Sequence, residues 1–223
     1  MLKQKLKAPI GLLGGTFNPI HWGHLLPTKT IMNELNLSRV MLIPNHRPPH
    51  KQTPGVDSNK RAAMVKLACE QMKKQYNSEF ETNLLELERT EPSYTVETLK
   101  ILQQQNPNTP LCFLMGLDSL INFHTWYQFE QIIELCHLVV STRPGYQLPA
   151  NSEAANMLSQ RQVQSPQELE QSLGGKIYLA NIEPVDVSSS QIRASLAENK
   201  KVDHLLPENV LTYINKMQLY RKA

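Results

Sequence analysis

The sequence predicts an α/β protein built on a doubly wound parallel sheet, with helices on both faces. Short apolar runs that suit buried strands alternate along most of the chain with longer segments whose apolar residues recur at helical spacing. The length of 223 residues is enough for one α/β domain with a sizeable core and too short for two large ones. We therefore expect a single domain over residues 1–223, with ligands bound beyond the carboxyl ends of the strands.

Each expected element has its own local pattern. The expected strands are the apolar or alternating runs 8–13, 39–43, 80–88, 111–115, 138–140 and 176–180. The expected helices are the segments after residue 24, over 58–74, from about 93 to 105, from 188 and from 207. Ser93 resembles the first residue of a capping box, and Pro207 suits the first turn of the C-terminal helical segment. From about 145 to 175 the sequence is polar, which indicates a surface excursion that contains a polar helix.

The amino-acid composition indicates which cellular compartment and which kinds of binding partner suit this chain. A net charge of +3 and a pI near 8.7 suit anionic small molecules, whereas the basic residues are too evenly spread for a nucleic-acid interface. We expect no signal peptide, because the apolar stretch after Lys3, Lys5 and Lys7 is short and is broken by Gly14-Gly15. We expect no membrane partner, because no run approaches the ~18 apolar residues of a membrane span. Cys69, Cys112 and Cys136 have apolar neighbours, so we expect buried free thiols and a cytoplasmic compartment. The sequence leaves the oligomeric state open, a homo-oligomer included.

The segment from Gly14 to His24 is the most informative motif. It ends an apolar strand and begins an amphipathic helix, a junction where Gly14 and Gly15 let the backbone approach an anion closely. His21 and His24 stand three residues apart in the first helical turn, so their rings lie on one side, beside unpaired N–H groups. Imidazoles in this position donate hydrogen bonds to phosphate oxygens without a permanent charge. The segment therefore predicts a phosphate site.

The two histidines also have plainer interpretations, as residues of a surface turn or as part of a metal site. A third ligand at metal spacing is missing, because the sequence has neither a Cys-x-x-Cys pair nor a His-Glu-x-x-His motif. Phosphate binding is the interpretation that the local chemistry favours, and a structural turn is the main alternative.

A second constellation follows the last expected strand. Ser188, Ser189 and Ser190 stand where a helix begins, and serines favour such positions as caps for structural reasons alone. Their hydroxyls also suit phosphate oxygens, and Arg193, one turn further on, has the planar fork that clamps them. Two helix N-termini of a parallel sheet can converge on one polyphosphate, so the two motifs together predict a triphosphate site.

Both motifs resemble the signatures of the nucleotidyltransferases related to class I aminoacyl-tRNA synthetases. The signatures are Gly-Gly-Thr-Phe-Asn-Pro-x-His-x-Gly-His at 14–24 and Ser-Ser-Ser-x-Ile-Arg at 188–193. Further stretches narrow the resemblance to the bacterial nicotinate-nucleotide adenylyltransferases: Pro48-Pro49-His50-Lys51, the segment 93–99, Gly116-Leu117-Asp118-Ser119, Thr125-Trp126-Tyr127 and Arg143-Pro144-Gly145. The resemblance runs from about residue 10 to the C-terminus, is weakest over 145–175, and implies a Rossmann-like nucleotidyltransferase fold of the HUP type.

The resemblance implies a step of NAD biosynthesis in which ATP and nicotinate mononucleotide give nicotinate adenine dinucleotide (deamido-NAD) and pyrophosphate. The attacking phosphate is already ionised, so the transfer needs in-line alignment and relief of charge but neither a general base nor a covalent intermediate. Mg²⁺ would be bound through the ATP phosphates, without protein ligands. The implied catalytic residues are His21, His24 and Arg193. The implied ATP-binding residues are Gly14, Gly15, Thr16, Phe17, Asp118, Ser188, Ser189 and Arg143.

For the pyridine end, similarity to the family implies that Trp126 stacks on the nicotinate ring. Backbone groups near Thr95 and Tyr127 would meet the carboxylate, and His50 and Lys51 the phosphate of the mononucleotide. The plainer alternatives are a core aromatic for Trp126 and solvated loop charges for His50 and Lys51.

Two positions and two rival functions stay open. Asp118, which the resemblance places on a ribose hydroxyl, follows a glycine and is also suited to be an ordinary helix cap. Asn18 stands where the family usually has aspartate, which puts any metal or water contact of that side chain in doubt. A nucleotidyltransferase acting on phosphopantetheine would share both phosphate motifs but not the aromatic segment 125–127. A nucleic-acid-binding module would need a clustered basic face with interleaved aromatic residues.

Overall fold

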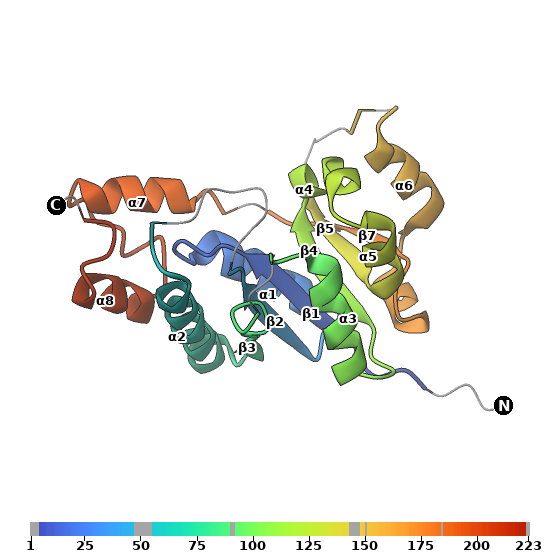
Figure 1. Ribbon diagram of the computed structural model, residues 1–223, viewed down its shortest axis with the longest axis horizontal. Helices are drawn as coiled ribbons and strands as arrows, with labels where there is room; N and C mark the ends of the chain where they lie inside the picture. The colour runs from blue at the N-terminus through green and yellow to red at the C-terminus, as the bar shows by residue number, and fades with distance from the viewer. Residues whose placement is uncertain are drawn as a thin grey trace. The chain divides into compact units, whose positions relative to one another are not determined.

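The structure is a computed structural model that describes residues 5–46, 55–89, 92–142, 148–149, 151–183 and 185–221 (Figure 1). Within these ranges the strands are β1 (Ile10–Gly15), β2 (Arg39–Pro44), β3 (Phe80–Thr82), β4 (Leu111–Gly116), β5 (His137–Thr142), β6 (Gln162–Val163) and β7 (Ile177–Asn181). The α-helices are α1 (Trp22–Glu34), α2 (Ser58–Tyr76), α3 (Thr95–Gln105), α4 (Leu117–Ile121), α5 (Phe129–Leu135), α6 (Glu153–Arg161), α7 (Ser189–Ala197) and α8 (Glu208–Lys216). Short 3-10 helices are η1 (Phe123–Thr125) and η2 (Pro166–Gln171).

The strands form one sheet in the order β3-β2-β1-β4-β5-β7-β6. The pairs β1–β4, β4–β5, β5–β7 and β7–β6 are parallel. Every residue from Leu111 to Met115 in β4 and from His137 to Val140 in β5 is buried. Neighbouring residues of a strand face opposite sides of the sheet, so continuous burial means that both faces are covered. The predicted doubly wound parallel α/β fold is confirmed.

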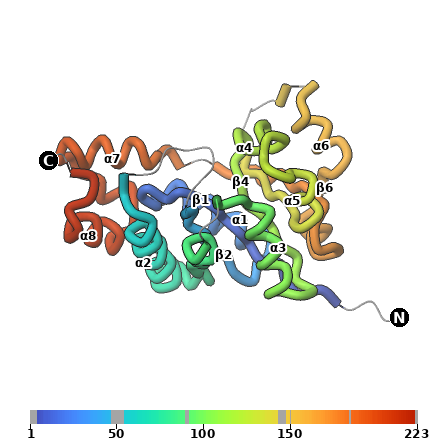
Figure 2. The backbone as a smooth tube through the Cα atoms, in the orientation of Figure 1, coloured from blue at the N-terminus to red at the C-terminus, as the bar shows by residue number. Residues whose placement is uncertain are grey.

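The chain divides into two compact units, and each is described by itself. Unit 1 comprises Met1–Leu13, Thr30–Val40 and Tyr94–Glu183, and unit 2 comprises Gly14–Lys29, Met41–Ser93 and Pro184–Ala223. In unit 2, α8 packs beside α2 although the two helices are far apart in sequence (Figure 2). Asn209 of α8 holds this contact, since its Nδ2 donates to the Leu67 carbonyl at 2.6 Å. Both phosphate motifs of the sequence belong to unit 2, and the single domain expected over 1–223 stays a prediction.

Unit 1 contains the stretch that the sequence marks as a polar excursion. The predicted polar helix is α6, and Ser152 caps it by accepting a hydrogen bond from the Ala155 N–H at 3.2 Å. The stretch also adds β6 to the edge of the sheet and buries four apolar side chains, those of Ala154, Leu158, Val163 and Leu169. The sequence did not predict β6, because a strand of two residues is too short to show a period.

The strand expected over 80–88 is wrong beyond Thr82. Asn83 Oδ1 accepts a hydrogen bond from the Leu85 N–H at 3.0 Å, and the Leu87 N–H donates to the Leu84 carbonyl at 2.8 Å. An asparagine side chain that pairs with the backbone two residues on starts a turn, which ends the strand.

The cap expected from Ser93 is also wrong. The N-cap of α3 is Tyr94, whose side chain makes no capping hydrogen bond. Ser93 Oγ instead accepts a hydrogen bond from the His46 N–H at 3.1 Å, which ties it to the segment after β2. Pro207 is the N-cap of α8 and so stands one position before the first turn.

None of the helices in the described ranges is long and apolar enough to cross a membrane. The three cysteines are free and buried, as predicted. Burial raises the pKa of Cys69 to about 11 and that of Cys112 to about 12, and it raises the pKa of Cys136 as well. These thiols are therefore protonated at neutral pH, and none has the lowered pKa of a nucleophilic cysteine.

Candidate active site

The loop between β1 and α1 carries most of the first motif. Phe17 has a left-handed backbone conformation with φ of 45°, and its ring is buried. A Cβ at Gly15 would lie 2.9 Å from that ring, so glycine is required where Phe17 folds back on the strand end. The Phe17 ring also meets the His24 ring edge-on, with 5.3 Å between centroids. Ring packing therefore holds Phe17, whose backbone is predicted to bind phosphate together with that of Thr16.

His21 and His24 form a close pair of tilted rings at the start of α1. Their ring centroids are 3.8 Å apart, and a Cβ at Gly23 would lie 3.0 Å from the His21 ring. Glycine at this position therefore leaves room for the pair. The backbone N–H of His21 donates to Nδ1 of His24 at 3.3 Å. A neutral His24 ring consequently carries its proton on Nε2, where it is a hydrogen-bond donor.

The His21 side chain is almost fully buried, with 4% of the residue exposed. Burial lowers the pKa of its imidazole to about 4, so the ring is neutral at pH 7. Its Nδ1 is buried and has no hydrogen-bond partner within the described ranges. A buried polar atom of this kind usually has a partner, and an oxygen of a bound anion would supply one.

The serines of the second motif have partners within unit 2. Ser188 is the N-cap of α7, because its Oγ accepts a hydrogen bond from the Gln191 N–H at 3.2 Å. Ser189 Oγ donates to the Pro19 carbonyl at 2.9 Å. The structure therefore gives Ser188 the cap role of the plainer interpretation, and it places the N-terminus of α7 against the first motif.

Asn18 is held from two sides. Arg193 donates from Nη1 to the Asn18 carbonyl at 2.8 Å and from Nη2 to Ser190 Oγ at 3.1 Å. Tyr220 Oη donates to Asn18 Oδ1 at 2.7 Å. The side chain that departs from the family pattern is thus bound by a tyrosine near the C-terminus.

A buried arginine that the sequence did not reveal lies beneath the same loop. Arg61 of α2 is 1% exposed and donates to three carbonyl oxygens: that of Thr16 at 2.6 Å, of Asn45 at 2.8 Å and of Val56 at 3.3 Å. The Asn45 N–H in turn donates to the Gly15 carbonyl at 2.9 Å. Sequence reasoning had no signal for Arg61, because an arginine in the first turns of a helix is usually exposed.

In unit 1 the structure groups the residues predicted for the pyridine end. Trp126 is half-buried and meets Phe113 edge-on, with 5.9 Å between ring centroids. Tyr127 is 51% exposed, and its ring lies 4.7 Å from that of Tyr94, next to Thr95 at the start of α3. Trp126 therefore packs on the aromatic core with part of its surface and keeps another part exposed.

Asp118 is an exposed residue in the first turn of α4. The N-cap of this helix is Gly116, so the alternative of Asp118 as a helix cap is wrong. A Cβ at Gly116 would lie 2.6 Å from Asp118 Oδ1, so the glycine leaves space for the carboxylate beside the end of β4.

Three predicted residues, His50, Lys51 and Arg143, lie outside the described ranges. The phosphate-motif residues belong to unit 2, and Thr95, Asp118, Trp126 and Tyr127 belong to unit 1, so each set is described separately. Among the residues that the structure describes, no group of three or more histidine, cysteine, aspartate or glutamate side chains could hold a metal ion.

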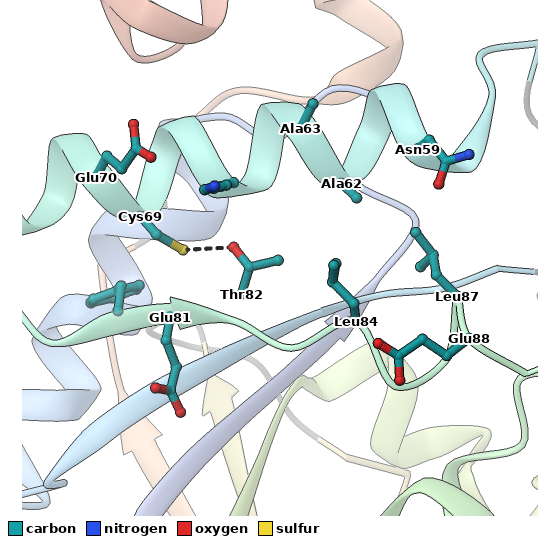
Figure 3. Close-up of a pocket in the computed structure, with 12 residues that line it drawn as sticks. Asn59, Ala62, Ala63, Cys69, Glu70, Glu81, Thr82, Leu84, Leu87 and Glu88 are labelled. Carbon is teal, nitrogen blue, oxygen red and sulfur yellow. Dashed lines mark hydrogen bonds between the residues drawn. The ribbon is translucent and has the colours of Figure 1, made fainter.

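A hollow of about 680 Å³ opens between α2 and the segment 80–88 (Figure 3). Cys69 lines it, with Sγ 3.5 Å from Thr82 Oγ1, together with apolar side chains such as Phe80 and Leu84. No residue predicted for the site is among the described residues that line this hollow, so it is not the candidate active site.

The chain is similar to known proteins over nearly its whole length. A family model described as cytidylyltransferase-like matches residues 12–195. A probable nicotinate-nucleotide adenylyltransferase of Aeromonas hydrophila is 44% identical over 98% of this chain and 100% of the relative. A protein of the same description from Salmonella gallinarum is 42% identical over 97% of this chain and 100% of the relative. The nicotinic acid mononucleotide adenylyltransferase of Plasmodium falciparum, solved in complex with NaAD, has a TM-score of 0.72 at 20% identity and covers 96% of this chain and 98% of its own.

The cytidylyltransferase-like match begins in β1 and ends in α7, so it includes both phosphate motifs, and the class of protein is a nucleotidyltransferase. The Plasmodium structure shows that the fold is shared, and at 20% identity its similarity shows the fold alone. The Aeromonas and Salmonella relatives go further, since their similarity is high and extends over whole chains. The chain belongs to the nicotinate-nucleotide adenylyltransferase family and is an enzyme of that type.

Proposed function

We propose that this chain transfers the adenylyl group of ATP to nicotinate mononucleotide and releases pyrophosphate. The observation that carries the proposal is the full-length similarity to curated relatives named for this activity. The Plasmodium enzyme solved with NaAD, the product of such a transfer, has the same fold. We further infer a cytoplasmic setting, where thiols such as Cys69, Cys112 and Cys136 stay reduced.

The triphosphate of ATP binds in unit 2. His24 donates from Nε2, and His21 supplies the buried Nδ1 that lacks a partner among the described residues. Arg193 stands one turn into α7, close to the first motif through its bond to Asn18. These groups favour anionic oxygens, because neutral imidazole donors and a guanidinium fork stabilise charge that builds up on phosphate.

The reaction is a direct in-line displacement. An oxygen of the mononucleotide phosphate forms a bond to the α-phosphorus of ATP as the bond from that phosphorus to the bridging oxygen of the β-phosphate breaks. The electron pair of the broken bond leaves with pyrophosphate. The nucleophile has no proton to lose at neutral pH, so His21 and His24 act as donors that orient phosphates and relieve charge. There is no covalent enzyme intermediate.

Magnesium enters with ATP, bound through the phosphates. The donor set of unit 2 fits this arrangement, since imidazole and guanidinium groups suit phosphate oxygens while Mg²⁺ prefers oxygen ligands. When bound, Mg²⁺ neutralises part of the charge on the triphosphate. The chain's own residues position the phosphates and exclude a misaligned attack.

The nicotinate ring binds in unit 1. The exposed part of Trp126 offers a face for stacking, and the N-terminus of α3 at Thr95 offers N–H groups for the carboxylate. Tyr127 packs on Tyr94 beside that helix end. Asp118 accepts from a ribose hydroxyl, His50 and Lys51 meet the phosphate of the mononucleotide, and Arg143 lines the ATP site.

Incubation with ATP, Mg²⁺ and one acceptor at a time tests the proposal. Nicotinate mononucleotide should give pyrophosphate and nicotinate adenine dinucleotide in equal amounts, detected by a coupled phosphate assay and by mass spectrometry. Nicotinamide mononucleotide measures the preference for the acid, and phosphopantetheine tests the rival nucleotidyltransferase. Turnover with phosphopantetheine alone, or with no acceptor, would contradict the proposed function.

A further inference from the structure

Arg61 is a fully buried arginine whose hydrogen bonds go to backbone carbonyl oxygens of three segments. Thr16 belongs to the loop after β1, Asn45 follows β2, and Val56 precedes α2. Carbonyl acceptors satisfy the donors of a guanidinium but do not cancel its charge. Burying such a group costs free energy, so its presence beneath the phosphate motif calls for a physical reason.

The bond from Arg61 to Thr16 sets the direction of the next amide. The Thr16–Phe17 peptide is trans, so its C=O and N–H point in opposite directions within one plane. Because the Thr16 oxygen faces Arg61 Nη1 at 2.6 Å, the Phe17 N–H is turned away from Arg61. No residue within the described ranges accepts a hydrogen bond from this N–H. Its donor is thus oriented and has no partner within that part of the chain.

Arg61 also closes a ring of hydrogen bonds that joins the ends of two strands. Gly15 O accepts from the Asn45 N–H at 2.9 Å, and the Asn45 carbonyl accepts from Arg61 at 2.8 Å. Arg61 completes the ring at Thr16. The left-handed conformation of Phe17 next to this ring is therefore fixed on its N-terminal side by a buried side chain.

We propose that Arg61 is a positioning residue for the triphosphate. By holding the Thr16 carbonyl, it aims the Phe17 N–H at a phosphate oxygen of ATP or of the product pyrophosphate. Arg61 touches no substrate and acts through the backbone. The proposal rests on the proposed function only in assigning this loop to the triphosphate.

Two substitutions of Arg61 test its hydrogen bonds separately from its positive charge. Arg61→Met keeps the length and removes every donor, and Arg61→Lys keeps the charge but cannot reach both carbonyls with a planar fork. We expect the KM for ATP to rise about 10- to 100-fold, the size of one lost hydrogen bond to a charged group. The KM for nicotinate mononucleotide should stay within about twofold. Arg161→Met is the matched control, because its guanidinium also donates to a carbonyl, that of Gly175 at 3.2 Å, but in unit 1.

The NMR signal of the Phe17 amide distinguishes a positioning role of Arg61 from a general loss of structure. In ¹⁵N NMR spectra, inorganic pyrophosphate should shift the Phe17 amide of the unsubstituted protein and of Arg161→Met, and it should leave that amide largely unshifted in Arg61→Lys. Circular dichroism verifies folding, and if Arg61→Met does not fold, Arg61→Lys decides.

Three outcomes overturn the role of Arg61: a folded variant with unchanged KM for ATP, an equal rise of both KM values, or a Phe17 shift that persists. Failure of the proposed function looks different. An unsubstituted chain whose Phe17 amide shifts with pyrophosphate, while that of Arg61→Lys does not, and which makes no dinucleotide would refute the reaction while supporting the role of Arg61.

Discussion

At the scale of single residues, the candidate site depends on which ring nitrogen of each histidine carries a proton. Because Nδ1 of His24 accepts from the backbone, Nε2 must donate. We expect His24→Ala to lower kcat by about 10²- to 10³-fold, the usual effect of removing one preorganised donor from developing charge. Steady-state assays with saturating ATP and nicotinate mononucleotide measure this change. A folded His24→Ala variant with near-normal turnover would remove His24 from the catalytic residues.

The buried His21 ring makes stability depend on pH. Its folded pKa is about 4 and its ordinary value 6.5, so both states hold a neutral ring above pH 6.5. Below that pH the unfolded state binds the proton first, and the free energy of unfolding falls until about pH 4, by roughly 3 kcal/mol at most. Urea unfolding at pH 7.5 and pH 4.5 should therefore show a smaller loss for His21→Gln than for the unsubstituted protein. Burial lowers the pKa of His137 too, but His137 is present in both proteins and contributes equally to each. An equal loss of unfolding free energy in His21→Gln and in the unsubstituted protein would therefore show that His21 does not cause the pH dependence.

The residues that the sequence predicted for the site differ from Arg61, which it missed, in how far along the chain their partners lie. The sequence predicted His21, His24, Ser188 and Arg193, because residues a few positions apart at the start of a helix lie on the same side of it. Arg61 meets Thr16 across 45 positions of sequence. Such a pairing leaves no local pattern, since any arginine of an amphipathic helix has the same spacing.

At the scale of elements, the sequence pattern located the longer strands and helices but not α4, α5 or β6, which are short. Short-range side-chain bonds set the ends that it misplaced. The core of β4 and β5 was predictable because strands buried on both faces are continuously apolar. The end of β3 was not, because the Asn83 bond to the Leu85 N–H stops the strand within an alternating pattern. Ser93 has the sequence of a cap, yet its hydroxyl bonds to the His46 N–H, which no local rule predicts.

The start of α3 and the end of η1 give a prediction at this scale. Trp126→Ala should raise the KM for nicotinate mononucleotide by about tenfold, the value of one aromatic stacking contact, and change the KM for ATP much less. Trp126→Phe should restore part of the affinity, because it keeps an aromatic face and the contact with Phe113. Equal changes in both KM values would show that Trp126 contributes to the core alone.

At the scale of the whole molecule, segments late in the sequence form hydrogen bonds with segments early in it. Within unit 2, Tyr220 reaches Asn18 across 202 positions, and Ser189 reaches Pro19 across 170. The sequence predicted that the two motifs meet because parallel strands bring their following helices to one edge. It had no means of predicting Tyr220, because the turn after α8 that delivers it follows no motif.

The bond between Tyr220 and Asn18 yields the last prediction. Tyr220→Phe removes the hydroxyl that donates to Asn18 Oδ1 at 2.7 Å and keeps the ring. A double-mutant cycle with Asn18→Ala, measured by urea unfolding, should give a coupling free energy of about 1 kcal/mol, because each single change breaks the same bond. Asn18→Asp should keep that bond and strengthen it, since a phenol donates more strongly to a carboxylate than to an amide, and the Arg193 guanidinium bound at the Asn18 carbonyl offsets the new charge. Additive effects in the cycle, or destabilisation by Asn18→Asp as large as by Asn18→Ala, would mean that the C-terminal tyrosine only packs beside the loop and does not hold the Asn18 side chain.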